Sequence, residues 1–260
     1  MELVFTQMLT LLYALWWPFC RALAFLSASP VIGDGMVPLP LRVLLSLVLA
    51  VVMLPLSQGG ASVDPFSLHG VMATVEQAVI GGVLGLAFHL TISAVMVLGY
   101  LASSQMGFAM AVMNDPVNGT SSDVVSATLM LLCTLVFFAV DGHLVLVGVL
   151  GASFRAWPVG SGLNALMLQT LAFNVAWVFS AALLLALPLV FSTFVVQIGF
   201  GFMNRVAPTL NLFSLGFSVV TLFGLFMLAQ MLRFVPEHYV RMTGQVLEML
   251  QRQMRGLPHG

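Results

Sequence analysis

Long apolar segments, separated by short stretches rich in proline, glycine and polar residues, run along nearly the whole chain. A helix needs about 20 consecutive apolar residues to cross the hydrocarbon core of a membrane. Six segments meet that requirement, at roughly 8 to 29, 40 to 57, 76 to 103, 124 to 151, 164 to 202 and 212 to 235. The pattern predicts an all-α integral membrane protein with about six long hydrophobic helices.

The third, fourth and fifth segments are longer than one crossing requires, so they are expected to tilt, kink or extend beyond the membrane. Pro188 lies inside the fifth segment, where it removes a helical hydrogen bond and predicts a kink. Gly81, Gly82 and Gly85 form a small-residue face in the third segment. Such a face lets another helix approach closely, either within the chain or from another subunit.

Composition agrees with a membrane protein and argues against a soluble fold and a nucleic-acid-binding protein. Of the 260 residues, 60% are hydrophobic and 7% are charged, whereas a soluble fold carries about 25% charged residues. All eight basic residues are arginine and the net charge is -1, which argues against a nucleic-acid-binding surface. Cys20 and Cys133 lie far apart in apolar segments with no histidine at ligand spacing, so we expect core side chains and no metal site.

The chain from Glu237 to Gly260 differs from the apolar segments before it, because charged and apolar side chains alternate there. Leu247, Leu250 and Met254 share one helical face, which predicts an amphipathic helix. Two interpretations stay open, a helix lying at an interface and a solvated terminal helix.

The segment from Gln105 to Ser122, QMGFAMAVMNDPVNGTSS, interrupts the apolar pattern most strongly. Irregular backbone exposed to lipid is disfavoured, so the segment is expected outside the bilayer or along a protected cavity. Met106, Met110 and Met113 are flexible and polarizable enough to close around an opening, and residues 114 to 119 are rich in turn formers. Composition alone leaves an ordinary aqueous loop and a gate as alternatives.

Ionisable groups within the apolar segments are few, and Asp141-Gly142-His143 is the densest cluster. Buried charges in membranes are often functional, so a proton relay or a metal site is one interpretation. One histidine and one aspartate are too few ligands for a metal, and a helix kink or loop is the favoured interpretation. A membrane enzyme relying on Asp141 and His143 is the weakest alternative.

Several short motifs occur in a specific order. They are Pro30-Val31-Ile32-Gly33 with Pro38 and Arg42; Gly99, Gln105-Met106-Gly107 and Asp115-Pro116; Gly142-His143 with Ser153-Phe154 and Pro158; and residues 205 to 213, RVAPTLNLF. The last resembles an R-x-x-P-Q-x-N-x-F pattern preceded by Gly201. Thr209 stands where glutamine is usual, which removes the side-chain amide but leaves the turn-forming Pro208 and Asn211. In order and spacing, these motifs resemble the FliR family of the flagellar export gate, which has counterparts in virulence type III secretion systems.

The resemblance implies one copy of this chain assembled with several FliP and FliQ subunits into a helical gate, with the FlhB switch protein at its cytoplasmic side. It implies helical hairpins within that hetero-oligomer, a location in the bacterial inner membrane and flagellar basal body, and parts that project toward the periplasm. Residues 1–160 are implied to resemble a FliP unit, and residues 161–260 a FliQ-like hairpin with the amphipathic tail. Unfolded export substrates are implied to pass through the centre of the gate.

The same resemblance implies that the loop from Gly107 to about Ser122 is a plug that seals the channel. An apolar, deformable constriction of this kind excludes water and ions when closed yet yields to a passing chain. The implied plug residues are Met106, Gly107, Phe108, Met110, Met113, Asn114, Asp115 and Pro116. An entrance-side turn is implied at Arg205, Pro208, Asn211 and Phe213. No catalytic residue, cofactor or metal is implied.

Together these features predict a non-enzymatic subunit of a flagellar type III protein-export gate. The chain has no GxxxxGK[ST] loop, so ATP hydrolysis would have to come from another protein. The alternative is a small-solute secondary transporter. Such proteins carry paired half-repeats with broken helices at the midplane, and the interrupted segments here do not recur in two matching halves.

Overall fold

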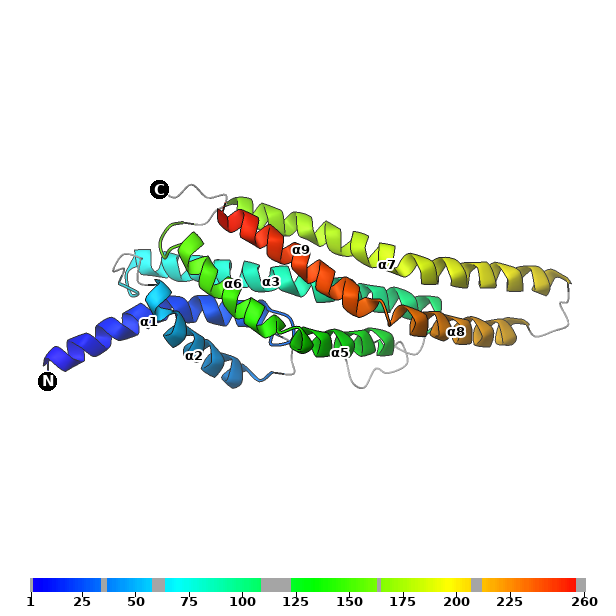
Figure 1. Cartoon of the computed structure of the whole chain (residues 1–260), viewed down its shortest axis with the longest axis horizontal. Helices are drawn as coiled ribbons and strands as arrows, with labels where there is room; N and C mark the ends of the chain where they lie inside the picture. Colours follow the sequence, from blue (N-terminus) through cyan, green and yellow to red (C-terminus); the bar gives the residue numbers. More distant parts are fainter. Residues whose placement is uncertain are drawn as a thin grey trace. The chain divides into compact units, whose positions relative to one another are not determined.

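The computed structural model describes residues 2–33, 37–57, 64–108, 123–162, 165–206 and 212–255. Within those ranges the chain forms helices and no strand (Figure 1). The helices are α1 (Glu2–Ala28), α2 (Leu39–Ser57), α3 (Leu68–Gln105), α5 (Val124–Ala139), α6 (Gly142–Ala156), α7 (Ala165–Val206), α8 (Leu212–Met231) and α9 (Val235–Arg255). The predicted all-α class is confirmed.

Four helical segments are long and apolar enough to cross a membrane: Met8–Ala28, Leu39–Ser57, Leu68–Gln105 and Asn174–Val206. Two bent pairs, α5 with α6 and α8 with α9, raise the number of candidate spans to six if each pair is one span. This agrees with an integral membrane protein of about six hydrophobic segments.

The fourth predicted segment is two helices in the structure. α5 ends at Ala139 and α6 begins at Gly142, and between them Asp141 adopts a left-handed conformation with φ 54° and ψ 33°. A left-handed residue cannot continue a right-handed helix, so the apolar segment is interrupted at the Asp141-Gly142-His143 cluster, where the sequence favours a kink or loop. By contrast, Pro188 lies inside the single helix α7.

The chain divides into two compact units. The first comprises Met1–Leu90, Phe138–Asn174 and Thr243–Gly260, and the second comprises Thr91–Phe137 and Val175–Met242. The division implied near Ser161 concerns likeness to FliP and FliQ and stays a prediction.

In the first unit, α1 packs against α2, and α2 also contacts α6 (Figure 1). The small-residue face of α3 packs against α1: a Cβ at Gly81 would meet the backbone oxygen of Arg21, and one at Gly85 the backbone oxygen of Phe25. A Cβ at Gly82 would meet nothing within 4 Å. Gly81 and Gly85 therefore bring two helix backbones together within the chain, whereas Gly82 does not take part.

The amphipathic helix predicted at the C-terminus is α9. Its apolar face is buried within the protein, with Tyr239 2% and Leu250 1% exposed. Its charged side chains are exposed and pair one helical turn apart, as in Glu237 with Arg241. The apolar face is thus not left free for a membrane surface.

The structure of the second unit centres on the last turn of α3, the start of α5, and the helices α7 and α8. These elements surround both ends of the segment that joins α3 to α5. This region contains the first residues of the predicted plug.

Candidate functional site at the base of the 109–122 loop

The α3 helix ends in a specific stop motif. Gly107 has φ 79°, a left-handed conformation that glycine adopts without strain. The Gly107 N–H donates to the carbonyl of Ser104 at 3.3 Å, and the Phe108 N–H donates to the carbonyl of Ser103 at 3.0 Å. These are the two hydrogen bonds of a Schellman motif, which ends a helix and turns the chain sharply. The end of α3 and the turn of the chain as far as Phe108 are therefore defined.

The other end of the loop is fixed by Asp123, which directly precedes α5. Its Oδ2 accepts hydrogen bonds from the backbone N–H of Ser126 at 3.1 Å and from the Ser126 hydroxyl at 2.9 Å. A carboxylate in this position satisfies the free N–H groups of the first helical turn. Asp123 is 8% exposed, so this cap is buried.

The two ends of the loop are joined by a side-chain hydrogen bond. The hydroxyl of Ser103, in the last turn of α3, donates to Oδ1 of Asp123. Next to it, α3 and α5 approach so closely that a Cβ at Gly99 would lie 2.6 Å from the Ser126 Cα. The residues on either side of the segment 109–122 are consequently held together by buried contacts.

The first residue after α3 also contacts α8. The side chain of Met106 is 1% exposed and lies against Gly224, where an added Cβ would come within 2.9 Å of the Met106 sulfur. The Thr221 hydroxyl donates to the Met106 carbonyl at 2.9 Å. A Cβ at Gly107 would meet the Phe217 ring. Met106 and Gly107 are thus seated on α8.

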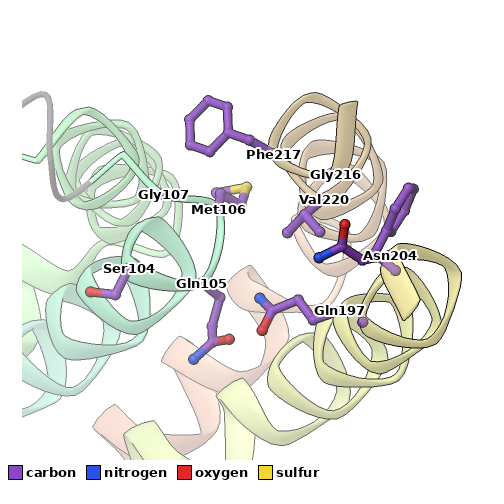
Figure 2. A pocket seen from close by; sticks show the side chains of 11 residues that line it. Ser104, Gln105, Met106, Gly107, Gln197, Asn204, Gly216, Phe217 and Val220 are labelled. Atoms are coloured by element: carbon purple, nitrogen blue, oxygen red, sulfur yellow. The ribbon is translucent and has the colours of Figure 1, made fainter. Parts of the chain in front are cut away.

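Beside this contact is a cavity of about 430 Å³ between the end of α3, α7 and α8. Its lining is apolar apart from Ser104 and three side-chain amides, those of Gln105, Gln197 and Asn204. Figure 2 shows Gln197 pointing toward Gln105, and Met106 directed toward α8. None of the lining side chains is titratable. The site can therefore hold a segment by packing and hydrogen bonding but offers no group for acid–base chemistry.

The sequence matches a family model described as "Bacterial export proteins, family 1" over residues 12–246. The chain belongs to this family. FliR-type relatives extend over nearly its full length. It is 33% identical to the flagellar biosynthetic protein FliR of Pectobacterium carotovorum subsp. carotovorum over 90% of each chain. It is 28% identical to the Escherichia coli (strain K12) FliR over 97% of each chain.

A relative outside the flagellar proteins is the Yop proteins translocation protein T of Yersinia pestis, 29% identical over 60% of each chain. The matches identify the protein as a member of the FliR family and a membrane component of a type III export apparatus. The predicted family is confirmed.

Of the plug residues predicted for this FliR-family chain, three are described. Met106 and Gly107 contact α8, and Phe108 completes the stop of α3. The remaining five lie outside the described residues: Met110, Met113, Asn114, Asp115 and Pro116.

The predicted entrance-side turn is described only at its margins. Arg205 lies in the last turn of α7 and is exposed, and Phe213 belongs to the first turn of α8. Pro208 and Asn211 lie outside the described residues. Their role stays a prediction.

Other residues at this site were not predicted from the sequence. Asp123 followed by Ser126 at the start of an apolar run is an N-cap signal that the sequence contains. Thr221 and Gly224 carry no comparable signal, since an isolated threonine and glycine in an apolar helix are common. Their importance arises from contact with Met106, 115 residues away for Thr221.

The cluster around Asp141 does not form a polar site in the described structure. Asp141 is exposed at the break between α5 and α6. The His143 ring lies 5.9 Å from the Phe138 ring, and its buried Nδ1 has no hydrogen-bond partner. Across the described ranges, no group of three His, Cys, Asp or Glu side chains could hold a metal ion. The break supports the interpretation of this cluster as a helix interruption.

Proposed function

We propose that this protein is a subunit of the flagellar type III export gate in the bacterial inner membrane, and that it forms part of the channel for unfolded flagellar substrates. The loop from Gly107 to Ser122 acts as the plug of that channel. The observation that carries the proposal is the closed base of the loop, where Ser103 and Asp123 join its two ends. A plug must be held in place while its tip yields, and a buried base with a methionine-bearing segment beyond it meets that need.

The proposed partners are the FliP, FliQ and FlhB proteins of the gate. The described helices leave large apolar side chains exposed along α2 and α7, for example Leu44, Val48, Leu184 and Phe191. Exposed apolar surface of this extent is typical of contact with lipid or other subunits. In this proposal residues 1–160 take the place of a FliP-like unit, residues 161–260 that of a FliQ-like hairpin, and parts of the gate project toward the periplasm.

The plug assignment is tested by replacing residues 109–122 with a glycine–serine linker of equal length. The base residues stay in place, so the complex is expected to assemble. Loss of the plug should then make the membrane permeable to ions and small solutes, measured as loss of membrane potential in cells that produce the variant. A matched linker at residues 58–63, between α2 and α3, is the control. A variant that assembles and leaves the membrane tight would contradict the plug.

A second experiment addresses the enzyme alternative. The Asp141→Ala/His143→Ala double variant removes both groups of the candidate relay. Because Asp141 and His143 lie at the break between α5 and α6 and form no polar site in the described structure, export of flagellar substrates should continue. Loss of export from a complex that still assembles would support a relay instead.

A further inference from the structure

The Met106 carbonyl is one of the acceptors that a helix end leaves without an intrahelical partner. In this chain its partner is Thr221 of α8, whose hydroxyl donates to it at 2.9 Å. The Ser103–Asp123 bond lies between α3 and the start of α5, so it closes the base of the loop without involving α8. The direction of the first loop residues therefore depends on a different helix from the one that closes the base.

Three residues of α8 make this contact from a single helical face. Phe217, Thr221 and Gly224 follow one another at spacings of four and three residues, which places them in one row along a helix. Phe217 meets Gly107, Thr221 binds the Met106 carbonyl, and Gly224 receives the Met106 side chain. We call these three residues the α8 seat.

The α8 seat is built so that it can open at low cost. The Thr221 hydroxyl has one proton but two acceptors at the same distance, the Met106 carbonyl and the Phe217 carbonyl of its own helix, both at 2.9 Å. When Met106 leaves, the hydroxyl still has its partner within α8. The part-buried Thr221 donor is therefore not left unsatisfied, and the hydrogen-bond cost of opening is limited to the Met106 carbonyl, which loses its donor.

We propose that Thr221 and Gly224 are the positioning residues of the plug, and that displacement of α8 from the end of α3 withdraws the first plug residues and opens the gate. The inference rests on the proposed plug function. It assigns to α8 the movement that must occur when a substrate passes. It also explains why a glycine stands at position 224, since a Cβ there would overlap the Met106 side chain, which would have to shift.

The hydrogen bond is tested with two substitutions of one residue. Thr221→Val keeps the shape but removes the hydroxyl, and Thr221→Ser keeps the hydroxyl. Loss of one such bond is expected to shift the closed-to-open ratio by about threefold to tenfold, seen as a matching rise in small-solute leak. Thr221→Ser should restore the tight membrane, which a purely structural role of the methyl group would not do. Equal leak in Thr221→Val and wild type would overturn the role of the hydroxyl.

The opening movement is tested by a reversible covalent lock. An ideal Cβ at Gly224 lies 3.7 Å from the Met106 Cβ, within the range that a disulfide requires. The Met106→Cys/Gly224→Cys double variant is made in a Cys20→Ser/Cys133→Ala background, with each single variant as control. Oxidation should stop secretion of flagellar substrates and keep the membrane tight, and reduction should restore secretion.

Complete oxidation is verified by peptide mass spectrometry. If the oxidised variant then secretes as fast as its dithiol form, the proposed opening is overturned. The linker at residues 109–122 separates this outcome from failure of the plug itself. If the linker variant leaks but the Thr221 variants and the lock have no effect, the plug is retained and the α8 seat is rejected. If the linker variant does not leak, the plug function fails first.

Discussion

The Nε of Arg21 on α1 donates a 2.7 Å hydrogen bond to the side-chain oxygen of Gln77 on α3, 56 residues away. The arginine has no exposed surface, and its other nitrogens donate to the Ser153 hydroxyl at 3.1 Å and to the Trp157 carbonyl at 2.7 Å. Its guanidinium also lies 4.2 Å from the centre of the Phe154 ring. A charge in an apolar environment is tolerated when its donors are satisfied, and here one side chain joins α1, α3 and the end of α6.

Arg21→Lys keeps the charge but cannot reproduce this set of contacts, because an ammonium lacks the planar fork of a guanidinium. We expect at least two of the three partners to lose their donor, at about 1–3 kcal/mol for each buried group left unsatisfied. The measurement is the thermal-unfolding midpoint of the purified protein in detergent. Arg155→Lys, at an exposed position on α6, is the matched control. Equal midpoints for the two variants would contradict the structural role of Arg21.

Much of the fold could be predicted because it depends on local sequence. The apolar segments gave the helices, and the glycines of the third segment predicted a close helix approach, which the structure shows for Gly81 and Gly85 against α1. The partners of Arg21 could not be predicted in this way. They stand 56, 132 and 136 residues further along, and each is of a residue type that is common in a helix or turn.

At the candidate site, too, local features could be predicted and contacts between distant residues could not. Gly107 and the departure from the apolar pattern marked where α3 stops, because these are properties of neighbouring residues. The contact of Met106 with Thr221 depends on how α8 packs, and no pattern along α8 distinguishes that threonine from others. The break at Asp141 could be predicted, by contrast, because Asp141-Gly142-His143 is a local polar cluster in an apolar segment, and the structure places a left-handed residue there.

The close approach of α1 and α3 predicts opposite effects at two adjacent glycines. Gly81→Ala would place a methyl against the backbone of Arg21 and 3.1 Å from the Phe25 nitrogen, and backbone cannot move aside as a flexible side chain can. We expect a loss of about 1–3 kcal/mol in stability from overpacking. Gly82→Ala meets open space and should be neutral or stabilise by about 0.4–1 kcal/mol, because alanine restricts the unfolded chain. Thermal unfolding in detergent compares the two, and equal effects would argue against the packed interface.

The closed base of the loop predicts a difference between two adjacent serines. The Ser103 hydroxyl is buried and donates to Asp123, whereas the Ser104 hydroxyl donates at 2.8 Å to the Tyr100 carbonyl of its own helix. Ser103→Ala leaves a buried carboxylate oxygen with one donor fewer, which costs about 1–3 kcal/mol. It should increase the rate at which added protease cuts within residues 109–122. Ser104→Ala should leave that rate close to wild type, and equal rates in the two variants would refute the closure by Ser103.

Replacing Gly107, the left-handed glycine at the start of the plug, is expected to lower stability for two reasons that can be measured separately. Gly107 has φ 79° and faces the Phe217 ring, whereas Gly160 has φ 80° and meets nothing within 4 Å. Gly160→Ala therefore measures the backbone cost alone, about 1–2 kcal/mol for a non-glycine residue in this region. Gly107→Ala adds the contact with Phe217, so its loss of stability should be the larger.

A Gly107→Ala/Phe217→Ala double variant separates the two parts. With the ring removed, the cost at Gly107 should fall to the value measured at Gly160, because only the backbone term then remains. Phe217 is 52% exposed and can move partly aside, so the steric part should be smaller than the backbone part. The measurements are thermal unfolding in detergent and small-solute leak in cells. A double variant as destabilised as the sum of its single variants would show that Phe217 and Gly107 do not interact, and would remove one of the three contacts of the α8 seat.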